Sequence, residues 1–242
     1  MDLGLTDKTA VVTGASKGIG LAITQALVAE GARVVAGARS SSPELDELVA
    51  GGRVVFESVD LSTPDAPARL VARSAEFGGL DILVNNVGAV AFRFDGFLAI
   101  TDEQWADTLN LSFLAAVRTT RAAIPLLIER GGGNVVTIGS VNAFLPDPPV
   151  VDYSAAKAAV WNLSKSLSKE FGAQNLRFNT ISPGPGATQL RLGENGVAAI
   201  SAENIGGDFD TALAVGATGE AGCSTGRVHQ PSNLRYLPVS FA

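Results

Sequence analysis

Cysteine and histidine are almost absent from this chain of 242 residues, which has one of each, Cys223 and His229. A single cysteine excludes an internal disulfide, as is usual in a reducing compartment. One residue of each kind cannot supply the ligands of a Cys/His zinc site, and a Ser-His-Asp triad would have to recruit His229 near the C-terminus. We therefore expect neither a bound metal nor this type of hydrolase.

Runs of lysine and arginine are also missing, and the formal net charge is −6. An acidic surface without a basic patch argues against nucleic acid as a partner. The N-terminal stretch lacks the basic start and apolar core of a signal peptide, and the apolar stretches look too short or too interrupted to span a bilayer. These absences predict a cytoplasmic protein that does not bind membranes.

Short apolar, β-branched runs alternate along the chain with longer segments of helical periodicity. The runs are Thr9–Val12, Arg33–Ala36, Val54–Phe56, Ile82–Val84, Asn134–Ile138 and Arg177–Ile181; the clearest helical segments are Ile19–Glu30, Trp105–Ile128 and Tyr153–Phe171. Such alternation is typical of buried parallel strands joined by helical crossovers. We predict a single α/β domain over residues 1–242, a Rossmann-like doubly wound parallel sheet with helices on both faces.

A glycine-rich loop follows the first run and precedes the first helical segment. Gly14 permits a tight turn off the strand, Gly18 lets the backbone approach a pyrophosphate, and Gly20 lets the helix pack closely on the sheet. The helix N-terminus offers free N–H groups and a positive dipole end to an anion. An ordinary strand-to-helix turn is the alternative, but the position at the first such junction favours dinucleotide binding.

The spacing Gly-x-x-x-Gly-x-Gly, together with motifs further along the chain, resembles the short-chain dehydrogenase/reductase family. The motifs are Asn85-Asn86-Val87-Gly88, Asn110, Ser140, Tyr153-Ser154-Ala155-Ala156-Lys157 and Pro183-Gly184, so the resemblance covers about residues 5–190. It implies a nicotinamide-dependent oxidoreductase. The cofactor-binding residues implied are Gly14, Ser16, Lys17, Gly18, Ile19, Gly20, Arg39, Asp60, Leu61, Asn86, Gly88, Tyr153, Lys157, Pro183, Gly184 and Thr188.

The end of the second predicted strand bears on the choice of cofactor. An acidic residue there would bind the ribose 2′-hydroxyl of NAD, but this strand ends without a carboxylate and Arg39 follows. Arg39, with Lys17 in the glycine loop, suits a 2′-phosphate, so we expect NADP(H) in preference to NAD(H). Asp60 matches the family residue that contacts the adenine amino group, and it also suits a turn or a helix N-cap.

Tyr153 and Lys157 are four residues apart, which places both on one face of a helix. A nearby ammonium stabilises a phenolate, so we expect Lys157 to lower the pKa of Tyr153 and make it an acid–base group. Ser140 follows the fifth predicted strand, where it can bond the substrate oxygen. The resemblance implies that Lys157 also holds the nicotinamide ribose and that Asn110 completes a proton relay through a water. Each residue alone also suits an ordinary amphipathic helix or cap.

The substrate is not specified by the sequence. Apolar surroundings favour a medium-sized alcohol or ketone, with a 3-oxoacyl thioester as a further possibility. The resemblance implies a homodimer or homotetramer, provided that the C-terminal segment permits it.

The segment after about residue 207 departs from the family pattern. It is rich in Gly, Ser, Thr and Pro, and the usual last strand with its Asp-Gly-Gly turn is not recognisable; only Thr211–Val215 and Tyr236–Phe241 suggest a helical turn and a weak strand. A replaced C-terminus would expose a sheet edge. The alternative function is therefore a catalytically weak nucleotide-binding or scaffold protein. A nucleotide-sugar epimerase would need a longer C-terminal part.

Overall fold

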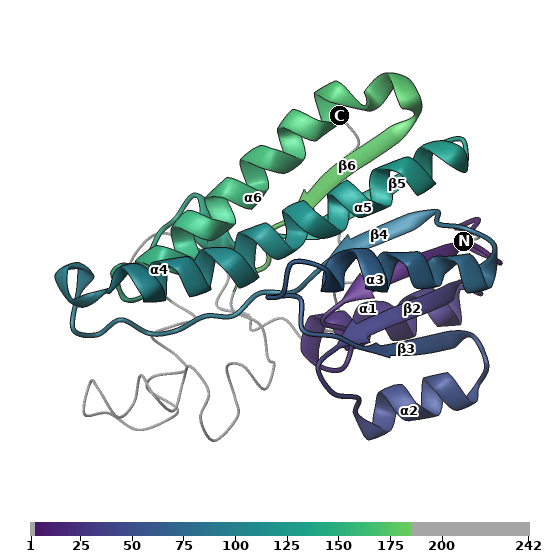
Figure 1. Ribbon diagram of the computed structural model, residues 1–242, viewed down its shortest axis with the longest axis horizontal. Helices are drawn as coiled ribbons and strands as arrows, with labels where there is room; N and C mark the ends of the chain where they lie inside the picture. Colours follow the sequence, from purple (N-terminus) through teal and green to yellow (C-terminus); the bar gives the residue numbers. More distant parts are fainter. Residues whose placement is uncertain (1–2, 185–242) are drawn as a thin grey trace. The chain divides into compact units, whose positions relative to one another are not determined.

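Six strands pair in parallel to form one sheet, in the order β3-β2-β1-β4-β5-β6 (Figure 1). The structure is a computed structural model that describes residues 3–184. The strands are β1 (Thr9–Thr13), β2 (Arg33–Ala38), β3 (Val54–Ser58), β4 (Ile82–Asn85), β5 (Gly133–Ile138) and β6 (Leu176–Ile181). Every predicted apolar run is confirmed as a strand, and the fold class is confirmed.

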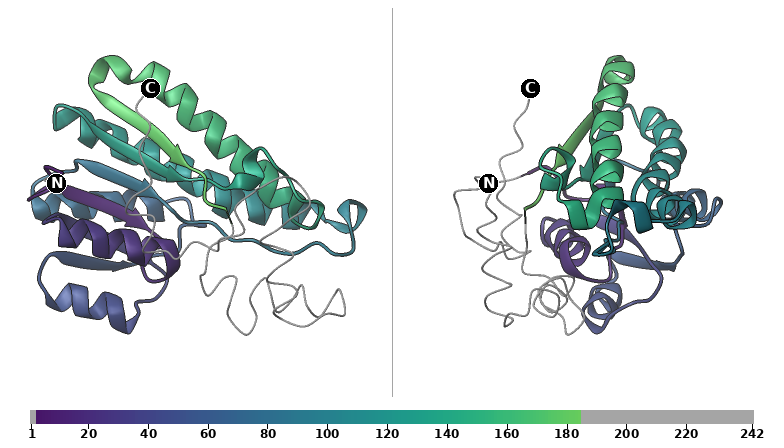
Figure 2. Two further views of the ribbon diagram at one scale, coloured as in Figure 1. Left: turned by 180° about the vertical axis from the view of Figure 1, so that it is seen from behind. Right: turned by 90° about the vertical axis from the view of Figure 1, so that its left-hand side faces the viewer.

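Helices cover both faces of the sheet (Figure 2). They are α1 (Gly18–Ala29), α2 (Pro43–Ala50), α3 (Ala66–Ala72), α4 (Asp102–Leu109), α5 (Ala115–Glu129) and α6 (Val151–Glu170). Alternate strand residues point to opposite faces, so Ala10 and Val12 pack with α1 and α2, whereas Val11 packs with α3 and α5. Two apolar cores, one on each face, hold the sheet between them.

Two helices were not predicted, and one predicted helix is divided. Helices α2 and α3 are short and have proline in their first turn, so their helical periodicity is weak. The predicted helix Trp105–Ile128 begins earlier, at a capping box made by Thr101 and Gln104. It is interrupted by a π-helix at Asn110–Leu114, which separates α4 from α5.

The helical run Asp102–Glu129 is long and apolar enough to cross a membrane by length and composition, with a mean hydropathy of 1.4 in its most apolar window. We expected the apolar stretches to be too short or too interrupted to span a bilayer, and by length and composition this run is an exception. Within the fold, however, α5 packs against α3 and against strands β4 and β5. A core helix passes the same test, so the run is weak evidence for a membrane span.

Residues Met1–Ser182 form one compact unit. The prediction of a single domain over 1–242 extends across residues outside the described range and stays a prediction. The same holds for the departure from the family pattern after about residue 207.

Gly20 fixes how closely α1 approaches the turn that precedes it. A Cβ on Gly20 would lie 2.1 Å from the carbonyl oxygen of Gly14 and 2.5 Å from the side-chain nitrogen of Asn86. The first of these neighbours is backbone, which cannot rotate away. The predicted close packing at Gly20 therefore has a direct steric cause.

Gly20→Ala should lower the free energy of unfolding by about 2 kcal/mol, because α1 must shift away from the turn. Gly172→Ala is the matched control, since nothing lies within 4 Å of a Cβ there; we expect a change within about 0.5 kcal/mol. Urea unfolding measures both. Equal effects at the two positions would show that α1 has room to move.

Candidate active site

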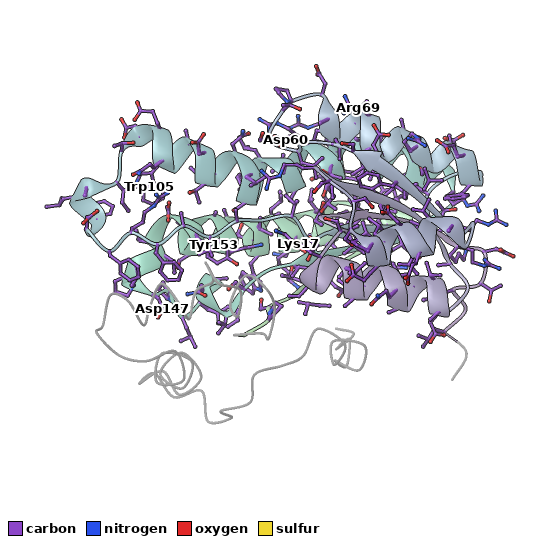
Figure 3. All side chains as sticks on the ribbon, turned by 90° about the horizontal axis from the view of Figure 1, so that it is seen from below. Lys17, Asp60, Arg69, Trp105, Asp147 and Tyr153 are labelled. Atoms are coloured by element: carbon purple, nitrogen blue, oxygen red, sulfur yellow. The ribbon has the colours of Figure 1, made fainter. Side chains whose placement is uncertain are left out.

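Several of the predicted cofactor residues lie where the strand order reverses, in the loops after β1 and β4. Because all the strands are parallel, the loops after β1, β4 and β5 leave the sheet at the same edge. The loop after β1 carries Lys17, and helix α6 carries Tyr153, which is labelled beside Lys17 in Figure 3. A dinucleotide crossing this edge would contact loops from both halves of the sheet.

The loops after β1 and β4 are bonded to each other by Asn86. Its side-chain nitrogen donates to the carbonyl oxygens of Thr13, at 2.9 Å, and Gly14, at 3.2 Å. The Thr13 hydroxyl accepts the backbone N–H groups of Asn86 and Val87. The predicted cofactor residue Asn86 thus shapes the glycine turn itself.

The glycine turn has the conformation that the sequence predicts. Gly14 and Gly18 have φ values of +66° and +54°, a region that residues with a Cβ rarely adopt. Helix α1 begins at Gly18 with no acidic residue in its first turn, and Lys17 at the N-cap is exposed and makes no side-chain capping bond. A close backbone approach, free N–H groups and a nearby cation fit a pyrophosphate.

Arg39 and Asp60 follow β2 and β3, and both are exposed. The pKa of Asp60 lies below its usual range because its carboxylate accepts hydrogen bonds from the backbone N–H and the hydroxyl of Ser62, and because Arg39 lies nearby. The interpretation of Asp60 as a turn residue is confirmed. Its contact with adenine stays a prediction, as does any contact made by the buried Leu61.

Ser140, Tyr153 and Lys157 come together beside the end of β5. The Lys157 ammonium donates to the carbonyl oxygen of Ile138 at 2.8 Å and lies 5.6 Å from the centre of the Tyr153 ring. The Ser140 hydroxyl caps a short helical turn by bonding Asn142, and it lies close enough to the Tyr153 phenol to lower the pKa of that group. Three of the four predicted catalytic side chains therefore share one site.

Burial shifts the pKa values of Tyr153 and Lys157 in opposite directions. Loss of solvent raises the pKa of Tyr153, and the hydrogen bond with Ser140 offsets only part of this rise. Burial lowers the pKa of Lys157 to about 8. We expected Lys157 to lower the pKa of Tyr153; instead burial raises that pKa, and the group that partly lowers it is Ser140, not Lys157.

Asn110 faces a different set of partners. Its side-chain nitrogen donates to the carbonyl oxygen of Ser62 at 2.8 Å, and its side-chain oxygen accepts from Arg118 at 2.7 Å. Neither amide atom bonds to Ser140, Tyr153 or Lys157. Ser112, which sequence analysis did not select, is buried two residues further along the same π-helix.

Gly88 lies close enough to Lys157 that a Cβ there would sit 3.1 Å from the ammonium nitrogen. Pro183 and Gly184 follow the compact unit Met1–Ser182, and Thr188 lies outside the described residues. The cofactor contacts assigned to these four residues stay predictions. So does the absence of a metal, although residues 3–184 contain no cluster of His, Cys, Asp or Glu suited to bind one.

Comparison with known proteins decides the family. Residues 8–195 match the family model described as "short chain dehydrogenase". The chain belongs to the short-chain dehydrogenase family. Members of this family are NAD(P)-dependent oxidoreductases, as the sequence predicts.

Three relatives show how far the likeness extends. The "Uncharacterized oxidoreductase YvrD" of Bacillus subtilis is 33% identical over 217 residues, which are 87% of this chain and 80% of the relative. The "3-oxoacyl-[acyl-carrier-protein] reductase FabG" of Salmonella typhimurium is 34% identical over 95% of this chain and 98% of its own length. L-sorbose reductase from Gluconobacter frateurii, solved with NADPH and L-sorbose, is 34% identical with a TM-score of 0.85, covering 97% of this chain and 89% of that one.

The likeness therefore reaches further than residue 190, where we expected it to end. The family model extends to residue 195. An alignment that covers 95% of the chain must also include part of the segment after residue 207. Whether the last strand of the family is present there lies outside the described residues.

This short-chain dehydrogenase contains a buried ion pair beside Tyr153 that sequence analysis missed. The side chain of Asp152 is fully buried, and one carboxylate oxygen accepts from Arg93 at 2.7 Å and from the Thr108 hydroxyl at 2.8 Å. The other oxygen accepts the backbone N–H of Tyr153 at 2.9 Å. The pair thus joins the loop after β4, helix α4 and the first turn of α6. The signal available in the sequence was that Arg93 and Asp152 each stand in a mostly apolar stretch, where a charged residue needs a partner.

Arg93→Ala should lower the free energy of unfolding near neutral pH by about 3–5 kcal/mol, because it leaves a buried carboxylate unpaired. Burial alone raises the pKa of Asp152, but the bonds from Arg93, Thr108 and the Tyr153 N–H hold it below the usual value. The stability that the pair provides is therefore present above the ordinary carboxyl pKa of about 4 and is lost as the pH falls through the lower folded value. Urea unfolding at several pH values measures this.

The matched control is Arg33→Ala, which removes an ion pair with Asp7 whose two side chains are both exposed. We expect that change to lower the free energy of unfolding by at most about 1 kcal/mol. If Arg93→Ala lowers it no more than Arg33→Ala does, the buried pair does not hold the segments together.

Proposed function

We propose that this protein transfers a hydride between NADP(H) and an alcohol or ketone, with Tyr153 as the acid–base group assisted by Lys157 and Ser140. The observation that carries this proposal is the cluster itself. A half-buried phenol, a buried ammonium and a buried hydroxyl meet at the sheet edge beside the glycine turn. Burying an ammonium among polar groups costs stability, and such clusters of groups with shifted pKa values are typical of functional sites.

The roles follow from the position of each group. The Ser140 hydroxyl holds the substrate oxygen and stabilises the charge that develops on it. In the direction of reduction, the Tyr153 phenol gives its proton to that oxygen. The Lys157 ammonium stabilises the phenolate left behind. When bound, the nicotinamide cofactor supplies or accepts the hydride.

The preference for NADP(H) is supported by charge. Arg39 stands where a carboxylate would select NAD, and Lys17 lies exposed at the N-cap of α1. Among proteins similar to this one, L-sorbose reductase is solved with NADPH. Asp60 offsets part of the charge of Arg39, so we expect a preference rather than an absolute requirement.

The substrate remains an alcohol or ketone of moderate size in this proposal. Phe144 and Leu145 follow Ser140 closely and are 56% and 45% exposed, which offers an apolar surface to a substrate. Similarity to an L-sorbose reductase and to a 3-oxoacyl-carrier-protein reductase defines two arms of a substrate panel, a ketose and a 3-oxoacyl thioester. A cytoplasmic homodimer or homotetramer also remains part of the proposal.

Tyr153→Phe should lower kcat by about a thousandfold, because the acid–base group is removed, while the Kd for NADPH stays within about threefold. NADPH fluorescence titration measures binding, and turnover on the substrate panel measures kcat. A wild-type protein that binds NADPH without any turnover would favour the alternative of a catalytically weak nucleotide-binding protein.

Arg39→Asp should remove the preference for NADP(H), because the variant presents a carboxylate to the 2′-phosphate. The ratio of kcat/KM for NADPH to that for NADH is expected to fall by at least about a hundredfold. Arg53→Asp, an exposed charge reversal just before β3, is the control. An unchanged ratio in Arg39→Asp would refute the cofactor assignment.

A further inference from the structure

Tyr153 lies in the first turn of helix α6, where the backbone N–H groups have no acceptor within the helix. Val150 at the N-cap makes no side-chain capping bond, so the acceptor must come from elsewhere. The carboxylate of Asp152 supplies it, because its Oδ1 atom accepts the Tyr153 N–H at 2.9 Å. A fully buried side chain therefore holds the start of α6 at Tyr153.

The other carboxylate oxygen of Asp152 accepts hydrogen bonds from two further segments. Arg93 donates to Oδ2 from Nε at 3.0 Å and from Nη2 at 2.7 Å, and the Thr108 hydroxyl donates to it at 2.8 Å. Arg93 lies in the loop after β4, and Thr108 lies in α4, which packs against α6 (Figure 1). One carboxylate thus joins the backbone of Tyr153 to two segments that are distant in the sequence.

A backbone hydrogen bond strengthens the same junction. The Arg93 N–H donates to the carbonyl oxygen of Pro149, just before α6, at 2.7 Å. The residues on either side of Arg93 stack on each other, with the ring centres of Phe92 and Phe94 5.2 Å apart. Because Arg93 is bonded through both its backbone and its side chain, this part of the loop cannot shift without moving the start of α6.

This network is better suited to fixing a position than to adding stability. A buried ion pair is often no more stabilising than well-packed apolar side chains in its place. What a carboxylate with several donors provides is direction, because each hydrogen bond has a narrow range of lengths and angles. A displacement of about 1 Å near a reacting group can cost about a hundredfold in rate. A fixed direction therefore matters for Tyr153, whose phenol must reach the substrate oxygen.

We propose that Asp152, Arg93 and Thr108 are positioning residues that hold the Tyr153 phenol in place against the substrate oxygen. The inference rests on the proposed function. All three residues act through the backbone of Tyr153, and none of them gives or takes a proton. Loosening the network should slow proton transfer, while the glycine turn after β1 continues to bind NADPH.

The test uses Thr108→Val, which removes one hydrogen bond to Asp152 with little change in shape and leaves the ion pair in place. Thr119→Val is the matched control, since the buried Thr119 hydroxyl donates to the Ala115 carbonyl oxygen of its own helix. Thr108→Val should lower kcat by about tenfold, with KM and the Kd for NADPH within about threefold. Thr108→Ser keeps the hydroxyl, so it should stay within about threefold of the wild type in kcat, as should Thr119→Val.

A spectroscopic readout separates positioning from a general loss of stability. The near-ultraviolet titration of Tyr153, with Tyr153→Phe subtracted in the same background, reports whether the phenol still lies beside the Lys157 ammonium and the bound nicotinamide. On adding NADP⁺, the fall in the pKa of Tyr153 should be smaller in Thr108→Val than in the wild type by about one pH unit. In Thr119→Val the fall should equal that of the wild type.

Arg93→Lys keeps the positive charge but not the paired donors of the guanidinium. It should show the same two changes, and it serves as the test if Thr108→Val is too unstable to assay. A kcat equal to that of Thr119→Val would overturn the inference, as would an undiminished effect of NADP⁺ on Tyr153. If the wild-type protein neither turns over nor shows a fall in the pKa of Tyr153 with NADP⁺, the proposed function fails, and the inference fails with it.

Discussion

The parallel direction of all six strands is the constraint on which the rest of this structure depends. It brings the ends of β1, β4 and β5 to one edge, although their sequences lie far apart. The side chain of Asn86 then bonds the turn after β1, and Lys157 bonds the last carbonyl of β5. If β1 ran opposite to β5, the glycine turn and the Tyr153 cluster would lie at opposite ends of the sheet.

Burial at this edge of the sheet shifts the pKa values of Tyr153 and Lys157 in opposite directions. The pKa of Tyr153 is raised, so the phenol loses its proton less readily than a free tyrosine. The pKa of Lys157 is lowered to about 8, so the ammonium loses its proton more readily than a free lysine. A phenol that gives and takes a proton near neutral pH needs additional positive charge beside it. The oxidised nicotinamide carries such a charge, so cofactor binding and acid–base competence are coupled in the proposed mechanism.

The sequence predicts the sheet well because buried parallel strands are continuous apolar runs, and all six were located to within two residues at each end. It also predicts the glycine turn, Ser140, Tyr153 and Lys157, since each stands next to a strand end or at helical spacing. Short helices such as α2 are not predicted from the sequence, because eight residues are too few to show a helical repeat of apolar positions.

Other features depend on geometry that no spacing reveals. A π-helix adds no sequence signal of its own, so neither the break at Asn110–Leu114 nor the partners of Asn110 could be predicted. Arg93 and Asp152 are 59 residues apart, and their pairing depends on how the loop after β4 folds over α6. Likewise, the rise in the pKa of Tyr153 depends on its burial, whereas the sequence showed only the lysine one turn away.

The most direct measurement is a spectroscopic titration of the tyrosines, of which the chain has two, Tyr153 and Tyr236. The near-ultraviolet absorbance of phenolate, recorded for the wild type and for Tyr153→Phe, isolates the ionisation of Tyr153. We predict that Tyr153 titrates above the ordinary tyrosine pKa of about 10 in the free protein, and that saturating NADP⁺ moves this ionisation well below that value. An ionisation of Tyr153 that NADP⁺ leaves unchanged would contradict its assignment as the acid–base group.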